Sequence, residues 1–196
     1  MKIILASKSP RRKELLSKVF HSFEIVVSEA DESLPEEVSL QEGVAVIAER
    51  KGQAVYDKLC RERGKDAADR FYIISSDTLV EVDGKPLGKP CDKAEAYGMI
   101  ESLSGREHYV RTGVAVSIGG VSLRDTASTK VIFKKLTEKE IEKYVSGDEP
   151  YDKAGGYGIQ GAAGEFVEKI EGDYDTVVGL SLSLVLDLLE KLMNRE

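Results

Sequence analysis

The sequence lacks the long apolar segments expected of a membrane or secreted protein. No apolar run reaches about 18 residues, which argues against a membrane-spanning helix, and we expect no membrane partner. The apolar run 3–6 near the start is too short for the core of a secretory leader. Internal repeats, low-complexity segments and linkers are absent as well. These absences predict one soluble globular domain over residues 1–196.

Cysteine and histidine are both scarce. Cys60 and Cys91 are the two cysteines, and their spacing is not that of a metal site. We therefore expect free thiols in a reducing cytoplasm. His21 and His108 are too few for a His-rich metal site, and neither suits a Ser-His-Asp triad.

Positive charge is also in short supply. The chain has 28 Lys and Arg against 35 Asp and Glu, for a net charge of −7. Phosphate contacts with nucleic acid need a basic face, so the balance argues against a nucleic-acid partner. A local cluster of cations can still hold a small anionic ligand.

Such a cluster stands at the start of the chain. The strand-like run 3–6 leads through Ser7 to Ser9, a typical N-cap, and Pro10, a typical first helical residue. Arg11 and Arg12 then put two positive charges beside the free N–H groups of the helix end. Cations are disfavoured there, so the pattern predicts a phosphate site, the alternative being a solvated basic turn.

An acidic block follows. Residues 22–49 contain eight acids and no Lys or Arg. Such a block is usually a solvated loop, but it is also where a divalent cation could find a carboxylate. Glu29, Asp31 and Glu32 are the candidates.

A lysine interrupts the apolar stripe of the next helix. Ser39 and Glu42 form a capping box that opens it. Lys51 lies in the middle of the stripe, so it must either extend out to solvent or reach into a polar cleft.

A buried strand is predicted at 71–74, and Ser75-Ser76-Asp77-Thr78 follows it. A carboxylate just past a buried strand lies where α/β sheets place their ligands. The strand pattern resumes at 79–82, and Asp83-Gly84 predicts a hairpin. The returning arm carries Lys89 back roughly level with Asp77.

The remaining pattern alternates helices and strands. Asp92 and Glu95 predict a helix ending at Gly105, and 110–118 alternates as a half-exposed strand should. A second strand reaches Phe133. Thr137 and Ser181 are N-caps of two further helices. This order predicts an α/β fold.

A glycine-rich segment precedes the last helix. Residues 152–164 contain five glycines, which allow close backbone approach to a ligand, although no Walker A or G-x-G-x-x-G spacing is met. Together with Lys153, the clusters above supply cations and carboxylates. With a divalent ion they suit attack of water on a phosphate ester or anhydride, a carboxylate taking the proton.

Six motifs, in order from residue 3 to about 184, carry a resemblance to the Maf family. They are Ala6-Ser7-x-Ser9-Pro10-Arg11-Arg12-x-Glu14-Leu15-Leu16, Lys51-x-x-Ala54, Ser76-Asp77-Thr78, Gly88-Lys89-Pro90, Leu103-Ser104-Gly105 and Glu149-Pro150-x-Asp152-Lys153-Ala154-Gly155-x-Tyr157-Gly158-Ile159-Gln160-Gly161. Ser76 departs from the Ala or Gly that relatives often have there.

The resemblance implies roles for these residues. Arg11 and Arg12 match a phosphate-binding pair, and Glu32 matches an acid that helps to hold the metal. Lys51 and Lys89 match two catalytic lysines. Asp77 matches the proton acceptor and would also contact the metal. Ser7, together with the phosphate-binding pair, matches a substrate-binding position. Arg11, Thr78 and Gln160 match positions that determine the choice of base.

The resemblance also implies the fold and activity. The family's proteins are nucleoside triphosphate pyrophosphatases with an elongated mixed sheet, flanking helices and two lobes around a central cleft, similar to inosine triphosphate pyrophosphatases. Gly-Ile-Gln-Gly at 158–161 resembles the subgroup acting on dTTP and UTP, with Mg²⁺ or Mn²⁺ as cofactor. The alternatives are a 7-methyl-GTP pyrophosphatase and a nucleotide-binding regulator of septum formation, and a homodimer stays open.

Overall fold

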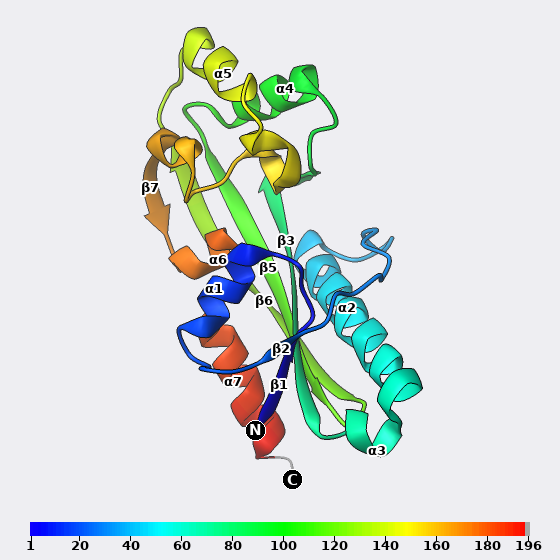
Figure 1. Cartoon of the computed structure of the whole chain (residues 1–196). Helices are drawn as coiled ribbons and strands as arrows, with labels where there is room; N and C mark the ends of the chain where they lie inside the picture. Colours follow the sequence, from blue (N-terminus) through cyan, green and yellow to red (C-terminus); the bar gives the residue numbers. More distant parts are fainter. Residues whose placement is uncertain (195–196) are drawn as a thin grey trace. The chain divides into compact units, whose positions relative to one another are not determined.

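The computed structural model describes residues 1–194 and divides into two compact units (Figure 1). Of the described residues, unit 1 comprises 1–77, 112–127 and 179–194, and unit 2 comprises 78–111 and 128–178. One seven-stranded sheet, in the order β2-β1-β3-β5-β6-β7 with β4 paired to β3, supplies strands to both. Its mixed pairing and flanking helices confirm the predicted α/β class.

The strands combine parallel and antiparallel pairing. β1 pairs in parallel with β2 and β3, whereas β3 with β4 and β6 with β7 are antiparallel. Their bounds are β1 Lys2–Leu5, β2 Glu24–Ile25, β3 Phe71–Val82, β4 Lys85–Leu87, β5 Glu107–Ile118, β6 Val121–Phe133 and β7 Val167–Glu171.

The helices begin where the sequence places N-caps. The side chains of Ser9, Ser39, Asp92, Thr137 and Ser181 each accept a backbone N–H at a helix start. The helices are α1 Pro10–Ser17, α2 Leu40–Arg63, α3 Lys65–Ala68, α4 Lys93–Leu103, α5 Glu138–Val145, α6 Tyr174–Val178 and α7 Leu182–Met193, with short 3-10 turns η1 Glu149–Asp152, η2 Ala154–Gly156 and η3 Ala162–Phe166. The described residues contain no helix long and apolar enough to cross a membrane.

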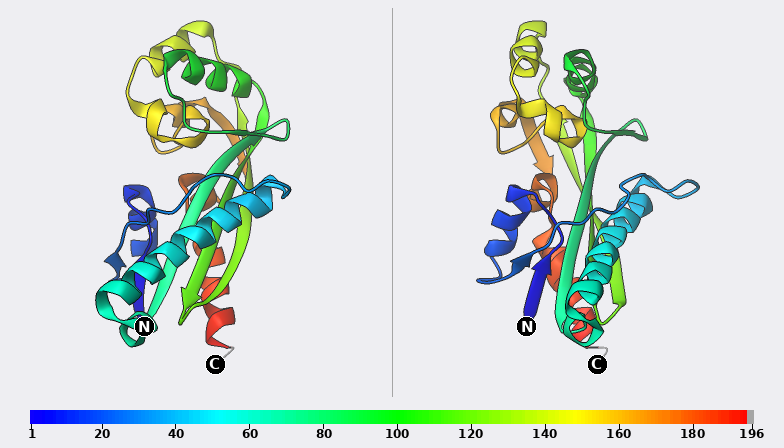
Figure 2. Two further views of the ribbon diagram at one scale, coloured as in Figure 1. Left: turned by 90° about the vertical axis from the view of Figure 1, so that its right-hand side faces the viewer. Right: turned by 45° about the vertical axis from the view of Figure 1, so that its right-hand side comes forward.

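In unit 1 the helices cover the sheet on both faces. Figures 1 and 2 show α1 and α7 on one face and α2 with α3 on the other. On the α2 side, Val55 and Leu59 pack with Ile4 and Ile73 of the strands. Burial of an aliphatic side chain of this size contributes about 1.5–3 kcal/mol, so α2 is firmly attached to the sheet.

Unit 2 has a core of its own. Ile100 of α4 and Ile141 of α5 pack in one cluster with Val110 of β5 and Phe133 of β6. Tyr157, from the glycine-rich segment, is 5% exposed and lies in the same cluster. The glycine-rich segment is therefore anchored to the core through this side chain.

Three local predictions are wrong in detail. The strand predicted at 71–74 continues without a break to Val82, so Asp77 lies within β3 and not past its end. Residues 112–117 are all buried, so this half of β5 is not half-exposed. Glu42 of the predicted capping box is bound to Arg124 instead, and only Ser39 caps α2.

Candidate functional site

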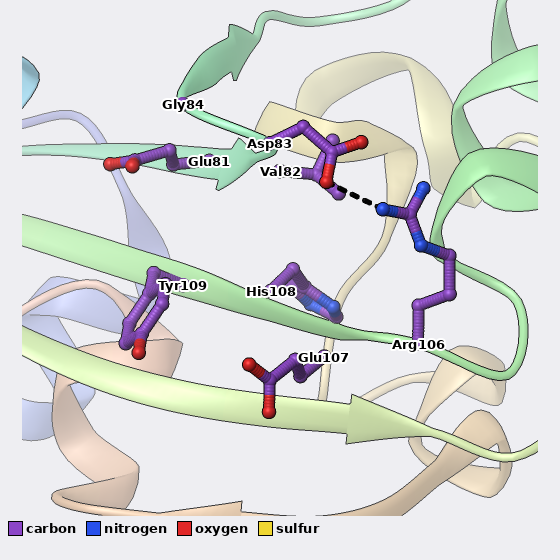
Figure 3. A pocket seen from close by; sticks show the side chains of 8 residues that line it. All are labelled: Glu81, Val82, Asp83, Gly84, Arg106, Glu107, His108 and Tyr109. Atoms are coloured by element: carbon purple, nitrogen blue, oxygen red, sulfur yellow. Dashed lines mark hydrogen bonds and ion pairs between the residues drawn. The ribbon is translucent and has the colours of Figure 1, made fainter.

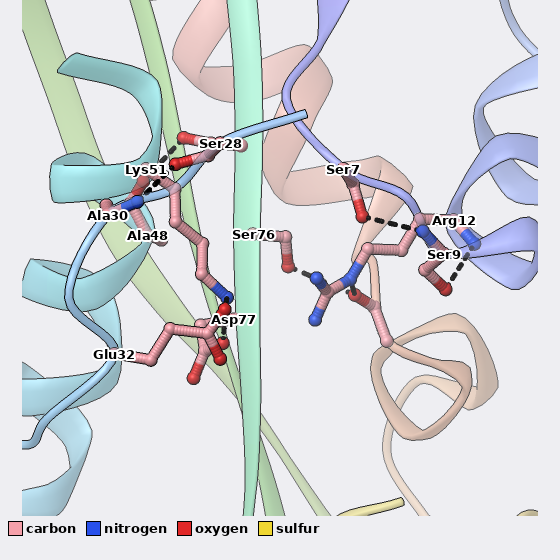
Figure 4. Close-up of polar contacts among 12 residues, drawn as sticks. Ser7, Ser9, Arg12, Ser28, Ala30, Glu32, Ala48, Lys51, Ser76 and Asp77 are labelled. Atoms are coloured by element: carbon pink, nitrogen blue, oxygen red, sulfur yellow. Dashed lines mark hydrogen bonds and ion pairs between the residues drawn. The ribbon is translucent and has the colours of Figure 1, made fainter. Parts of the chain in front are cut away.

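A buried lysine ammonium between two carboxylates is the centre of the candidate site in unit 1. Lys51 is 7% exposed, although it lies on a helix. Its Nζ donates to Oδ1 of Asp77 at 2.6 Å and lies 3.0 Å from Oε1 of Glu32 (Figure 4). Lys51 therefore does not extend out to solvent, and its ammonium group lies against two carboxylates.

Two glycines bring α2 close enough to the sheet for this contact. A Cβ on Gly52, next to Lys51, would lie 2.9 Å from Oγ of Ser75 on β3. A Cβ on Gly113 of β5 would lie 2.3 Å from the carbonyl oxygen of Val44. The helix backbone thus rests almost directly on the strands, which places the lysine beside Asp77.

The acidic segment between β2 and α2 provides the second carboxylate. Of its candidates, Glu32 contacts Lys51, whereas Asp31 accepts the N–H and hydroxyl of Ser33 and pairs with Arg50. The hydrogen bond from the Ser33 hydroxyl lowers the pKa of Asp31. The carboxylate of Asp31 is thus engaged locally.

The arginine pair begins α1, as the sequence predicts. Oγ of Ser7 accepts the N–H of Ser9, and Oγ of Ser9 accepts that of Arg12, so the turn is held by its own serines. Nε of Arg12 donates to the carbonyl oxygen of Gly179 at 2.8 Å. Figure 4 shows Arg12 and Lys51 on opposite sides of β3.

The electrostatics of Arg12 tie it to the same cluster. Burial lowers the pKa of Arg12, and the carboxylate of Asp77 acts in the opposite direction. The charge of Arg11 adds to the lowering, and Glu32 opposes it. A guanidinium is not deprotonated in proteins, so Arg12 stays charged at neutral pH.

Two groups in this arrangement were missed by the sequence analysis. The carbonyl oxygen of Gly179 accepts both Nε of Arg12 and Oγ of Ser76, at 2.8 and 3.0 Å. It thereby fixes the arginine head relative to β3. A backbone carbonyl leaves no residue-type signal, and Ser76 was read only as a departure from the family pattern.

Thr78, Lys89 and Gln160 belong to unit 2. Thr78 directly follows Asp77 on β3, and Lys89 and Gln160 are exposed. The backbone N–H of Gly155 donates to the carbonyl of Gly88 at 2.8 Å, which joins the glycine-rich segment to the segment of Lys89. Within unit 2, the predicted lysine and the loop of Gln160 are therefore linked.

Glu32 and Asp77 are the carboxylates of unit 1 to consider as ligands of a divalent cation. Among residues 1–194, no group of three or more His, Cys, Asp or Glu side chains could hold a metal by itself. Glu32 and Asp77 nevertheless converge on one ammonium nitrogen. Mg²⁺ is usually held by one or two carboxylates together with substrate phosphates and water, so Glu32 and Asp77 are the residues that could hold such an ion.

Unit 2 also contains a cavity of about 500 Å³, shown in Figure 3. Residues 81–84 and 106–109 line it, and the predicted site residues are not among them. Its charged side chains are paired: Asp83 with Arg106 at 2.5 Å, Glu81 with Arg111, and Glu107 with Lys130 at 3.2 Å. This cavity is not the candidate site.

Comparisons with known proteins agree on one family. The family model described as Maf-like protein matches residues 2–192. Proteins named dTTP/UTP pyrophosphatase are similar along nearly the whole chain: that of Bdellovibrio bacteriovorus is 41% identical, covering 96% of this chain and 97% of the relative. The corresponding protein of Clostridium botulinum is 45% identical, covering 95% of each.

A third relative of that name, from a Geobacillus species, is 46% identical and covers 97% of both chains. Among solved structures, the Staphylococcus aureus Ham1 protein aligns with a TM-score of 0.45 at 16% identity, covering 68% of this chain and 72% of that one.

Proposed function

Since this chain belongs to the Maf-like protein family, we propose that it is a pyrophosphatase that hydrolyses dTTP and UTP to the nucleoside monophosphate and pyrophosphate. Relatives at 41–46% identity carry the name dTTP/UTP pyrophosphatase, and the alignments leave almost no part of either chain uncovered. The chemistry is that of a hydrolase acting on a phosphoric anhydride.

One observation carries the proposal to this chain's own residues. A lysine ammonium, buried in unit 1, is held by the carboxylates of Glu32 and Asp77. Burial of this charge costs free energy unless partners satisfy it, and a purely structural position could have been filled by an apolar residue. Such an arrangement suits a site that binds a polyanion with its counter-ion and stabilises the charge that develops on it.

The reaction follows from these groups. Arg11 and Arg12 bind phosphate oxygens, and Ser7 holds the turn that carries them. Asp77 accepts the proton of the attacking water, whose oxygen bonds to the α-phosphorus while the bond from that phosphorus to the bridging oxygen of pyrophosphate breaks. Lys51 stabilises the negative charge on the transferring group.

Glu32 and Asp77 would hold a divalent cation, Mg²⁺ or Mn²⁺. Such an ion neutralises charge on the phosphoryl oxygens when it is bound. In unit 2 we assign Lys89 to the leaving pyrophosphate and Thr78 and Gln160, with Arg11, to choice of base.

The proposal extends to setting and partners. We infer a cytoplasmic protein, for which the two free thiols Cys60 and Cys91 are suited. The partner is a nucleoside triphosphate, and neither nucleic acid nor membrane is expected to bind. A homodimer and a single domain over residues 1–196 stay predictions.

A side-by-side turnover assay tests the proposal. UTP, dTTP and 7-methyl-GTP are incubated with the wild-type protein in Mg²⁺ or Mn²⁺, and pyrophosphate is detected. We expect similar rates for UTP and dTTP, and a much lower rate for 7-methyl-GTP. A preference for 7-methyl-GTP would contradict the choice of base, and binding of nucleotide without turnover would favour a regulator.

A further inference from the structure

The carboxylate of Glu149 lies inside the glycine-rich loop of unit 2. Its Oε2 accepts the backbone N–H of Ala162 at 2.9 Å, and its Oε1 lies 3.5 Å from the N–H of Ala163. A Cβ on Gly161 would lie only 2.2 Å from Oε1. The backbone at 161–163 is therefore wrapped closely around this one side chain.

The contact satisfies a turn that has no cap of its own. η3 begins at Ala162, and its N-cap residue, Gly161, has no side chain to accept the first N–H groups. A carboxylate at that position provides both acceptors and a favourable charge. Glu149 does this from thirteen residues earlier in the chain.

Other contacts fix the beginning of the same loop. The hydroxyl of Tyr157 lies 2.7 Å from Nε2 of His108, with both side chains buried, and the N–H of Gly155 is bound to Gly88. The hydroxyl of Tyr144 donates to the carbonyl of Gly156 at 3.1 Å and lies 3.2 Å from Oε1 of Glu149. Burial and the nearby Glu149 carboxylate raise the pKa of Tyr144, which keeps this hydroxyl protonated.

Gln160 lies between these two fixed stretches. Residues 155–157 are held from one side and residues 161–163 by Glu149, and Gln160 itself is exposed. Nζ of Lys153 donates to the backbone carbonyl of Glu149 at 2.8 Å, which fixes the main chain of the residue that does the holding. The backbone of Gln160 is thus held on both sides, at 155–157 and, through the Glu149 carboxylate, at 161–163.

We propose that Glu149 is a positioning residue for base selection, which holds the loop that presents Gln160 to the pyrimidine. This inference rests on the proposed function. A pocket discriminates between bases only when its polar groups are held where the correct base can pair with them. Loosening the loop should therefore reduce kcat/KM for UTP mainly by raising KM, with kcat largely retained.

A double-mutant cycle tests whether Glu149 acts through Gln160. We measure kcat/KM for UTP in Glu149→Ala, Gln160→Leu and the double variant. Each single change should lower kcat/KM about tenfold. The kcat/KM of the double variant should lie within about threefold of that of the less active single variant, because the two residues act as one unit. Glu149→Gln should keep more activity than Glu149→Ala, since its amide oxygen still accepts one N–H.

Asp148→Asn is the matched control, because it removes a neighbouring exposed carboxylate and should leave kcat/KM unchanged. Losses that multiply in the double variant, to about a hundredfold, would overturn the inference. So would a Gln160→Leu variant with wild-type kcat/KM.

A readout independent of activity separates this inference from the proposed function. Hydrogen–deuterium exchange at residues 158–163 should rise in Glu149→Ala and not in Asp148→Asn. Unchanged exchange in Glu149→Ala would overturn the positioning role even if UTP is hydrolysed. A wild-type protein that does not hydrolyse UTP or dTTP contradicts the proposed function instead.

Discussion

An ammonium group removed from water needs partners within hydrogen-bond distance. Lys51 has two, Asp77 at 2.6 Å and Glu32 at 3.0 Å, and it needs both because its stem is buried among apolar residues of α2. Asp77 is in turn 17% exposed in its side chain, whereas Glu32 is 55% exposed. Of the two partners of Lys51, Asp77 is the better shielded from water, and it is the one that we propose as the base.

Asp77→Asn should reduce turnover of UTP by at least about a hundredfold, in line with the contribution of a general base. The amide keeps the shape of the side chain but cannot accept a proton from water. Some loss of thermal stability is expected, because Lys51 is left with one charged partner. Steady-state kinetics and a melting curve on one preparation measure both effects.

Asp57→Asn provides the control, since Asp57 is exposed on α2 and accepts a hydrogen bond from Gln53 at 2.8 Å. It should behave as wild type. Near-wild-type turnover by a folded Asp77→Asn protein would rule out Asp77 as the base.

Arg12→Ala should raise KM for UTP strongly while kcat/KM falls by about tenfold or more, because a charge-assisted phosphate contact is lost. Removal of the side chain also frees the carbonyl of Gly179, which keeps its bond from Ser76. Lys13→Ala removes a neighbouring exposed cation and should change KM little. Equal increases in KM from Arg12→Ala and Lys13→Ala would mean that Arg12 contributes only its positive charge near the start of α1 and makes no specific phosphate contact.

At the scale of elements, the position of α2 decides whether Lys51 reaches the carboxylates. The helix lies against the Ser75 side chain of β3 at Gly52, and its own backbone lies against β5 at Gly113, where only a hydrogen atom fits. A side chain at either glycine pushes the helix away from the sheet.

Gly113→Ala should therefore destabilise the protein by about 1–3 kcal/mol and lower turnover as well. Its Cβ would lie 2.3 Å from a backbone oxygen of α2, so the helix that carries Lys51 must shift. Gly98→Ala is the matched control: nothing lies within 4 Å of its Cβ on α4, and it should stabilise the helix by about 0.5–1 kcal/mol. Chemical denaturation of both variants checks this, and a Gly113→Ala protein as stable as wild type would refute the tight approach of α2.

The elements that the sequence predicts well are those with local causes. Ser9, Asp92 and Thr137 cap helices through bonds that span three residues, so their patterns are visible in the sequence. The turn at Asp83-Gly84, with positive φ at both residues, is another such case.

The predicted end of the strand after Ile74 is wrong, because the contacts that continue the strand come from distant parts of the chain. Ser75 and Ser76 resemble a loop, yet both are fully buried. Their hydroxyls donate to the carbonyls of Ala48 and Gly179, which lie 27 and 103 residues away along the chain. Hydrogen bonds between residues so far apart in the sequence leave no local pattern. The same holds for the cap that Glu149 provides to η3.

At the scale of the whole molecule, the site residues come from many separate parts of the chain. Lys51 and Asp77 could be selected from their place in the sequence pattern and Glu32 through the family resemblance, and the structure brings these three together. Composition alone could not choose among Glu29, Asp31 and Glu32, since all three are carboxylates in one polar segment without a fixed period. Contact with Lys51 is what distinguishes Glu32.

Stability of the whole molecule should depend on pH through His108. Burial lowers its pKa to about 4, and its ring packs edge-on against Phe133 and Tyr157. Unfolding restores a pKa near 6.5, so the unfolded chain binds the extra proton first. The stabilising contribution is complete above about pH 6.5 and is lost as the pH falls towards 4, by about 3 kcal/mol in all.

Urea denaturation between pH 4 and 7 measures this dependence. His108→Gln should flatten the profile relative to wild type, because a glutamine does not titrate. His21→Gln, at an exposed position, should leave the profile unchanged. A His108→Gln profile as steep as wild type would assign the pH dependence to carboxylates alone.

The products formed from UTP test the central claim most directly. Phosphorus NMR of a reaction with the wild-type protein and Mg²⁺ distinguishes cleavage of the α–β bond from cleavage of the β–γ bond. We predict UMP and pyrophosphate in equal amounts, formed at least about a hundredfold more slowly by Asp77→Asn. UDP and inorganic phosphate, or no product at all with UTP and dTTP, would contradict the account.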